Sequence, residues 1–259
     1  MTLRDAVYGA AVGDALGVPY EFMPRGSFEC EGMTGYGTHR QPAGTWSDDT
    51  SMLLATCDSY RELGKVDCAD IRRRFEDWCR LGRYSCDGDV FDIGGTTATA
   101  LSLGRGLDGE RDNGNGSLMR IAPLAYFGAD ASKVGEVSAI THAHQVSKAA
   151  CVELVRALRQ IRSGRPLKAP DGPPTRSGGY VLDTLQSALW CLLSTRSYRD
   201  CVLAAVNLGD DTDTTACVAG ALAGEMYGFG AIPSEWVGAL RGRDLIERCV
   251  DGIGRLEAA

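Results

Sequence analysis

Apolar residues recur at helical spacing along most of this chain, and alternating strand patterns are almost absent. One segment places Val152, Val155 and Leu158 on a single helical face, and a second repeats the pattern over 181–192. We therefore expect an all-α fold, a multi-helix bundle. The other predicted helices span 3–17, 50–63, 68–81, 134–140, 198–205, 213–227 and 244–256.

Size and charge limit the classes of function. With 259 residues, 44% of them apolar, the chain can bury one large core, and we expect a single domain over 1–259. The net charge of -7 offers no basic surface to phosphate backbones or anionic lipid, so we expect neither a nucleic-acid nor a membrane partner. The sequence has no zipper pattern, and we expect a monomer.

The cysteines indicate the compartment. Ten are scattered through apolar stretches, and no two form a Cys-x-x-Cys pair. They are typical of buried thiols in a reducing cytosol. Asp5 and Asp14 interrupt the first twenty residues, and no window approaches a membrane-spanning length, so we expect a cytoplasmic protein. The clearest examples of such cysteines are Cys57, Cys151, Cys191 and Cys217.

Glycine-rich connections separate the predicted helices at 26–44, 87–95, 104–116 and 163–179. Sites are usually built on loops that a rigid scaffold holds in place, so we expect function to concentrate in the first three connections. The fourth, rich in proline and glycine, is expected to serve only as a connector.

The first acidic cluster is Ser47-Asp48-Asp49-Thr50, directly before the apolar run at 52–55. Its local interpretation is a helix start, with Ser47 as the N-cap and the aspartates complementing the positive end of the helix dipole. On these residues alone, a purely structural role stays open.

The second acidic cluster places Asp210, Asp211 and Asp213 before another predicted helix. Three aspartates in four positions exceed what one cap needs, and like charges this close repel one another unless a cation neutralises them. Together the two clusters offer carboxylates and hydroxyls without histidine or thiolate, the ligand set that Mg²⁺ or Mn²⁺ prefers over Zn²⁺. Two helix N-termini could hold two ions about 3.5–4 Å apart.

With these clusters, six ordered motifs over nearly the whole chain resemble the ADP-ribosylglycohydrolase family. The resemblance implies an all-α fold with two Mg²⁺ or Mn²⁺ ions at the base of a cleft. The family more often has threonine where this chain has Ser47, a change that concerns affinity because a serine hydroxyl can still coordinate. The motifs are Gly9 to Gly17 with Glu21, Ser47 to Thr50, Phe91 to Gly94, Asn115 to Arg120, Thr141-His142 and Gly209 to Thr214. The implied metal ligands are Ser47, Asp48, Asp49, Asp211, Asp213 and Thr214.

The same resemblance assigns the remaining site residues. Glu21 would polarise a water or assist proton transfer, and Asp92 would contact the ribose and take part in acid and base steps. On local evidence Glu21 could instead be a solvated surface residue, and Asp92 a cap of the next helix. The glycines at 9–17 are interpreted as close helix packing rather than chemistry.

The loop at 113–117 precedes a predicted helical segment, and such a loop offers backbone N–H groups to a phosphate, although a plain turn is an equal local alternative. The resemblance places the diphosphate and distal ribose here. His142 would lie beside the bound ADP-ribose, whereas His39 and His144 receive no role. The predicted substrate contacts are Asn115, Gly116, Ser117, Met119 and His142.

The resemblance therefore implies a metal-dependent hydrolase that removes ADP-ribose from a modified target, by attack of a metal-positioned water at the ribose anomeric carbon. The target would be an ADP-ribosylated protein, through arginine or a related linkage, or a small molecule containing ADP-ribose. One alternative is a non-catalytic ADP-ribose-binding or structural relative of the same fold. Another is a phosphohydrolase that uses the same acidic clusters.

Overall fold

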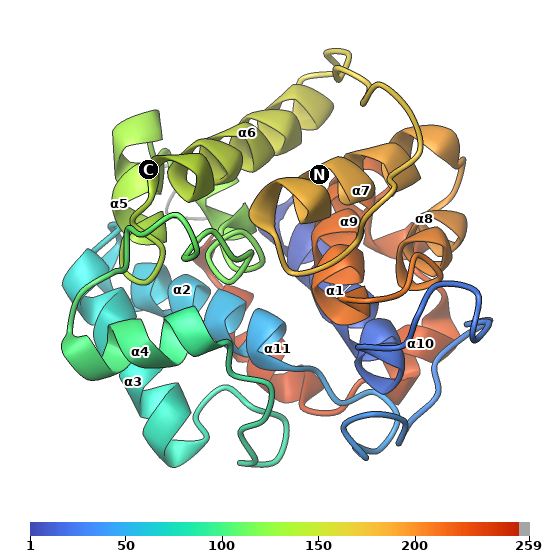
Figure 1. Ribbon diagram of the computed structural model, residues 1–259. Helices are drawn as coiled ribbons and strands as arrows, with labels where there is room; N and C mark the ends of the chain where they lie inside the picture. The colour runs from blue at the N-terminus through green and yellow to red at the C-terminus, as the bar shows by residue number, and fades with distance from the viewer. Residues whose placement is uncertain (254–259) are drawn as a thin grey trace.

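Helices make up the regular framework of the computed structural model, which describes residues 1–253 (Figure 1). These residues form no β-strand, only three isolated bridges between loops. The predicted all-α class is confirmed. The α-helices are Leu3–Gly17 (α1), Asp48–Leu63 (α2), Cys68–Leu81 (α3), Gly95–Leu103 (α4), Ala131–Ser138 (α5), Gln145–Arg162 (α6), Val181–Ser194 (α7), Tyr198–Val206 (α8), Thr212–Tyr227 (α9), Ser234–Ala239 (α10) and Arg243–Val250 (α11). Short 3₁₀ helices cover Val18–Tyr20 (η1), Ala122–Ala125 (η2) and Phe229–Ala231 (η3).

Local sequence signals set many of the helix ends. Ser47 caps α2, since its hydroxyl accepts a hydrogen bond from the Asp49 N–H at 3.4 Å, as predicted. Asp67 caps α3 in the same way, accepting from the N–H groups of residues 69 and 70. Gly64 and Gly82 end these two helices in the left-handed conformation, which glycine adopts at little cost.

Several boundaries differ from the sequence prediction. Helices α1 and α3 have the predicted ends, whereas α5 begins and ends earlier than 134–140. The predicted helix 244–256 corresponds to α11, which ends at Val250, and residues 254–256 lie outside the described residues. Helix α4 was not among the ranges predicted as helices. The segment after Ser117 contains turns and η2 rather than an α-helix.

Helix α1 lies in the interior and packs along α9 (Figure 1). A side chain at Gly9 would overlap the backbone of Gly220, and one at Gly13 would overlap the carbonyl group of Ala216. The two backbones therefore touch, which only glycine permits at these positions. The prediction that this small-residue stretch serves helix packing is consistent with this geometry.

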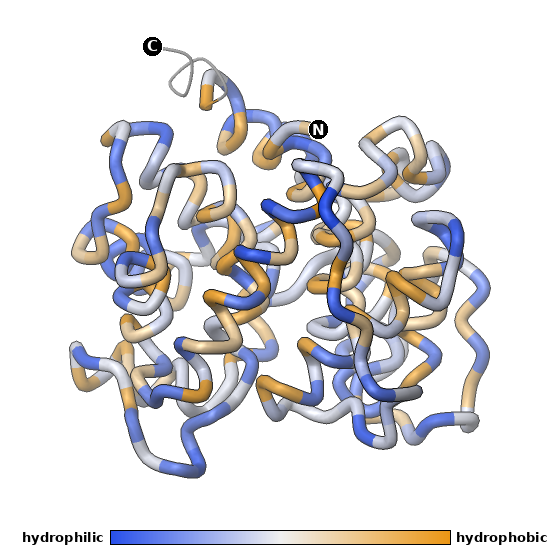
Figure 2. Tube along the Cα trace, turned by 90° about the horizontal axis from the view of Figure 1, so that it is seen from above, coloured by the Kyte–Doolittle hydropathy of each residue, from blue (hydrophilic) through white to orange (hydrophobic). Residues whose placement is uncertain are grey.

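The other helices pack on this pair or on one another. Helices α7 and α8 pack on α9, while α2 contacts α3 and α11 (Figure 1). Hydrophilic residues are most visible in the peripheral connections, as the hydropathy colouring of Figure 2 shows. None of the helices in residues 1–253 combines the length and apolar character that a bilayer crossing requires.

All ten cysteines are free thiols. The four singled out from the sequence are buried, as expected. Cys79, in contrast, is exposed near the end of α3, because it lies on the face of that amphipathic helix that turns away from the core.

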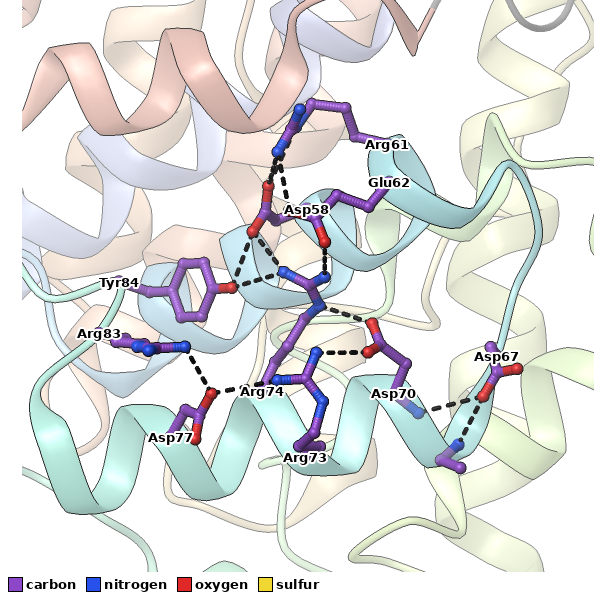
Figure 3. A network of polar contacts seen from close by, with 11 residues as sticks. Asp58, Arg61, Glu62, Asp67, Asp70, Arg73, Arg74, Asp77, Arg83 and Tyr84 are labelled. Carbon is purple, nitrogen blue, oxygen red and sulfur yellow. Dashed lines mark hydrogen bonds and ion pairs between the residues drawn. The ribbon is translucent and has the colours of Figure 1, made fainter.

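A buried arginine joins α2 to α3 (Figure 3). The Arg74 guanidinium donates to Asp58 (2.5 Å), to Glu62 (2.5 Å) and to Asp70 (2.6 Å), and it also contacts the Tyr84 hydroxyl (2.9 Å). Burial alone would raise the pKa of Asp70, but hydrogen bonds from Arg74 and a neighbouring arginine lower it to about 2. The cluster ties α3 to the C-terminal half of α2, the helix whose N-terminus carries the first acidic cluster.

The glycine contact between α1 and α9 can be tested with alanine. We expect Gly13→Ala to lower the free energy of unfolding by about 2–3 kcal/mol or more, because the obstructing atoms are backbone and cannot rotate away. Gly238→Ala, in α10, is the matched control, since open space surrounds Gly238. Urea unfolding followed by circular dichroism measures both, and equal stability of the two variants would contradict this account.

The Asp70 carboxyl should make the fold sensitive to acid. The pKa of Asp70 is about 2 in the folded state and about 3.9 in an unfolded chain. The carboxylate therefore makes its full contribution to the free energy of unfolding at pH values above about 3.9. The contribution disappears as the pH falls toward 2. After solvent screening we expect about 1 kcal/mol. The difference in unfolding free energy between the wild type and Asp70→Asn, measured from pH 6 to pH 2.5, should shrink with acid, and a constant difference would refute this.

Candidate metal centre and substrate pocket

The two acidic clusters meet at the N-termini of α2 and α9. The Thr214 hydroxyl donates to Asp49 Oδ1 at 3.2 Å, across 165 positions of sequence. Gly17, at the end of α1, permits this approach, because a side chain there would overlap the backbone of Asp213. The positive ends of two helix dipoles therefore point at one group of carboxylates.

Asp14 holds the start of α2 in place. This fully buried residue on α1 accepts hydrogen bonds from the Ser47 N–H (2.9 Å), the Thr50 N–H (3.0 Å) and the Thr50 hydroxyl (2.6 Å). Burial raises its pKa to about 6, although these hydrogen bonds oppose the shift. Sequence reasoning missed Asp14, and the available signal was a lone carboxylate inside a stretch of small apolar residues.

The carboxylates of the centre are too close and too buried to be stable as bare anions. Burial first, and then mutual repulsion, raises the pKa of Asp48, Asp49 and Asp213 well above the ordinary range. Among the described residues, no hydrogen-bond donor reaches Asp49 Oδ2, Asp211 Oδ1 or Asp213 Oδ2. Buried oxygens without a partner are costly.

This donor set fits a hard divalent cation. The candidate ligand oxygens of Glu21, Asp211 and Asp213 lie within 4.8 Å of one another. A cation here would satisfy oxygens that no donor in residues 1–253 reaches. Glu21, which the sequence analysis assigned only to catalysis, therefore also lies within the group of carboxylates that could hold the cation.

Backbone hydrogen bonds bring Glu21 to this position. The Phe22 N–H donates to the Asp210 carbonyl (2.6 Å), and the Asp210 N–H donates to the Met23 carbonyl (2.9 Å). These bonds tie the end of η1 to the loop before α9. The Thr38 hydroxyl donates to the Glu21 carbonyl (2.7 Å) and so holds the 32–44 loop beside them.

Glu21, Asp92 and His39 form a second polar group beside the carboxylates. His39 Nε2 is hydrogen-bonded to Glu21 Oε2, and one ligand atom of each residue lies within 4.8 Å of the others. Burial, followed by the charge of Asp211, raises the pKa of Glu21 to about 8. Burial, followed by the charge of Glu21, raises that of Asp92 to about 8. One of the two carboxyls can therefore hold a proton near neutral pH.

The glycine loop at 113–117 is tied to the acidic centre through Asn115. Its side-chain amide donates to Asp211 Oδ2 (2.8 Å) and to the Thr184 hydroxyl (2.9 Å), and its backbone N–H donates to the Gly179 carbonyl (3.0 Å). Ser117 differs, since it is fully buried and its hydroxyl accepts from Ser138 at 3.0 Å.

His142 is a buried neutral imidazole. Burial, and then the charge of Arg120, lowers its pKa to about 3. The Thr141 hydroxyl accepts from Arg120 Nη2 (2.6 Å) and lies 2.8 Å from His142 Nδ1, so its own proton is directed to Nδ1. We assign the ring proton to Nε2 on this network, which makes Nε2 a donor.

A cavity of about 250 Å³ opens onto these groups. Most predicted site residues line it, whereas Ser47, Asp49, Asp213 and Ser117 are buried and are not among the lining residues. The predicted residues that line it are Glu21, Asp48, Asp92, Asn115, Gly116, Met119, His142, Asp211 and Thr214.

The fourth glycine-rich connection also reaches the site, contrary to the expectation of a plain connector. Gly179 lines the cavity, and the Ser177 carbonyl accepts from the Asp211 N–H at 3.1 Å. The proline- and glycine-rich composition of this loop did not indicate that it would reach the site. His39 was likewise left without a role, because nothing in the sequence indicated that it would lie beside Glu21. Asp92 does not cap α4, since Gly94 occupies the N-cap position.

The chain matches the family model described as ADP-ribosylglycohydrolase over residues 2–172 and 153–259. ADP-ribosylarginine hydrolase Tri1 of Pseudomonas putida (strain GB-1) is 36% identical, over 90% of this chain and 72% of the relative. The ADP-ribosyl-[dinitrogen reductase] glycohydrolase of Rhodospirillum rubrum is also 36% identical, over 91% of this chain and 88% of the relative.

A solved structure described as an ADP-ribosylglycohydrolase-related protein complex has the same fold. It superposes with a TM-score of 0.83 at 32% identity and covers 98% of this chain and 97% of that chain. With the family match over nearly all residues, the motifs and the fold lead to one conclusion: the chain belongs to the ADP-ribosylglycohydrolase family.

Proposed function

We propose that this protein hydrolyses the bond between ADP-ribose and an arginine side chain of a modified protein, with Mg²⁺ or Mn²⁺ as cofactor. The observation that carries the proposal is the meeting of two acidic helix N-termini, with unpaired carboxylate oxygens, beside the Glu21–Asp92 pair. The choice of arginine is supported by the name of the Pseudomonas putida relative.

The cation ligands are proposed from the sequence motif and from the placement of the side chains. Bound divalent cations would supply Lewis acidity next to the ribose hydroxyls. Because the donors are oxygens, Mg²⁺ and Mn²⁺ fit better than Zn²⁺. The proposed ligands of two ions are Ser47, Asp48, Asp49, Asp211, Asp213 and Thr214.

The reaction breaks the bond between the anomeric carbon of the ribose and the guanidino nitrogen. A water oxygen forms the new bond to that carbon, and one water proton passes to a carboxylate of the Glu21–Asp92 pair. The leaving nitrogen takes a proton from the same carboxyl pair, so arginine is restored, ADP-ribose is freed and the pair returns to its starting protonation. The raised pKa of both carboxyls, about 8, suits a pair that accepts and returns a proton near neutral pH.

The glycine loop and His142 would bind the ADP-ribose. The Nε2–H of His142 can donate to a phosphate or ribose oxygen without carrying charge. Asn115 joins the bound nucleotide to the metal centre, since its amide also holds Asp211. The proposed contacts are Asn115, Gly116, Ser117, Met119 and His142. We further propose that residues 1–259 act as one monomeric unit in the cytoplasm.

The activity can be measured directly. Purified protein should release free ADP-ribose from an arginine-ADP-ribosylated peptide with Mg²⁺ or Mn²⁺, and EDTA should stop the release because the unpaired carboxylate oxygens then lose their cation. A serine-ADP-ribosylated peptide serves as the comparison. Release from serine alone would reject the arginine linkage, and release from neither by folded, metal-bound protein would favour the non-catalytic alternative. Release of inorganic phosphate instead would indicate a phosphohydrolase.

The ligand assignment has its own test. Asp49→Asn and Asp213→Asn should each lower metal-dependent turnover by more than about 100-fold. Without added cations both variants should melt at a higher temperature than the wild type, because each replaces a carboxyl that is costly to ionise in this buried cluster with a neutral amide. The rise in melting temperature on adding Mg²⁺ should be lost. Ser47→Thr is the matched control and should keep both activity and the Mg²⁺ response. Near-normal turnover in either asparagine variant would exclude that residue as a ligand.

A further inference from the structure

Phe22 combines a strained backbone conformation with an exposed aromatic side chain. Its side chain is 67% exposed, and its φ of 64° lies in the left-handed region. For a bulky residue this is a true outlier, and such strain persists only where surrounding contacts enforce it. Here the hydrogen bonds between residues 22–23 and Asp210 enforce it. The ring is thereby kept on the wall of the substrate cavity.

Two more rings extend from Phe22 past the catalytic carboxyls. The His39 ring lies 6.0 Å from that of Phe22, and the Phe91 ring lies 5.1 Å from that of His39. His39 is hydrogen-bonded to Glu21, and Asp92 directly follows Phe91 in the sequence. The rings of Phe22, His39 and Phe91 therefore form an aromatic row beside the Glu21 and Asp92 carboxyls, which we propose to transfer the proton.

An exposed aromatic ring next to carboxylates attracts a planar cation. Guanidinium groups stack on aromatic faces and pair with carboxylates at the same time. No lysine or arginine is among the residues lining this cavity, so no fixed positive charge there competes. A neutral leaving group, such as the hydroxyl of serine, would gain nothing from this arrangement.

The position of the row relative to the chemistry identifies the part of the substrate that it meets. A group that protonates the leaving nitrogen must lie within hydrogen-bond reach of it. Phe22 follows Glu21 in the chain, and both line the cavity. The His39 ring, which is hydrogen-bonded to Glu21, also lies next to the Phe22 ring, so an aromatic surface is available on the Glu21 side of the cavity, whereas the Asn115 loop and His142 line other parts of it.

We infer that Phe22, with His39 and Phe91 beside it, forms the leaving-group subsite and selects the guanidinium of ADP-ribosylated arginine over neutral linkages. This inference rests on the proposed function. It makes Phe22 a specificity-determining residue that contacts the substrate outside the ADP-ribose moiety.

The experiment compares Phe22→Leu, Phe22→Tyr and the wild type on the arginine-linked peptide, with inhibition by free ADP-ribose as a second readout. Phe22→Leu should raise KM roughly 3- to 30-fold, the range of a partly desolvated cation–π contact, and leave the inhibition constant of ADP-ribose unchanged. Phe22→Tyr should restore the wild-type KM. Methylguanidinium, as a turnover-independent probe, should bind the ADP-ribose-loaded wild type more tightly than loaded Phe22→Leu.

Tyr36→Leu is the matched control. Tyr36 is as exposed as Phe22 (68%) and equally left-handed (φ 68°), but it is not among the residues that line the cavity. Its replacement should leave KM unchanged, which separates the ring's contact with substrate from effects of backbone strain.

Three outcomes would overturn the subsite. An unchanged KM in Phe22→Leu, with arginine turnover intact in the wild type, removes the subsite and leaves the proposed function standing. A parallel rise in the ADP-ribose inhibition constant places Phe22 on the nucleotide instead. Absence of arginine turnover in the wild type, with equal methylguanidinium binding by both proteins, rejects the function and the subsite together.

Discussion

Helices α1 and α9 pack backbone against backbone, because glycine leaves no side chain between them at Gly9, Gly13 and Gly220. The contact fixes the end of α1 beside the start of α9, where Gly17 lies against Asp213. It also places Asp14 where its carboxylate can hold the start of α2. The position of both acidic clusters therefore follows from how closely two helices approach.

Three carboxylates at the centre are held by side chains from other elements. Hydrogen bonds join Thr214 to Asp49 and Asn115 to Asp211. A third joins His39 to Glu21. Hydrogen bonds between polar side chains therefore connect the elements that form the centre, where a buried charge without a partner is costly. The network leaves Asp49 Oδ2, Asp211 Oδ1 and Asp213 Oδ2 without a hydrogen-bond donor in residues 1–253 and thus free for a ligand.

Much of the fold could be predicted from the sequence, because buried helix faces leave a regular apolar spacing and capping residues mark the ends. Helix α4 was missed since its segment, rich in threonine and alanine, has no apolar stripe. The acidic clusters and Glu21 could be predicted from the motifs. Their partners could not, because His39 and Gly179 reach the site only through tertiary packing of loops. Phe22 was likewise missed, since no sequence pattern indicates a left-handed phenylalanine.

The pairing of α1 with α9 also sets an order of events during synthesis. Almost every residue of α1 is buried, yet the helix that covers it begins at Thr212. On the ribosome, the first helix therefore emerges long before its partner exists and must wait with its apolar surface exposed. The acidic centre is one of the last features to assemble, because it needs both helices. A nascent chain stalled before α9 would thus expose an aggregation-prone segment that a chaperone could recognise.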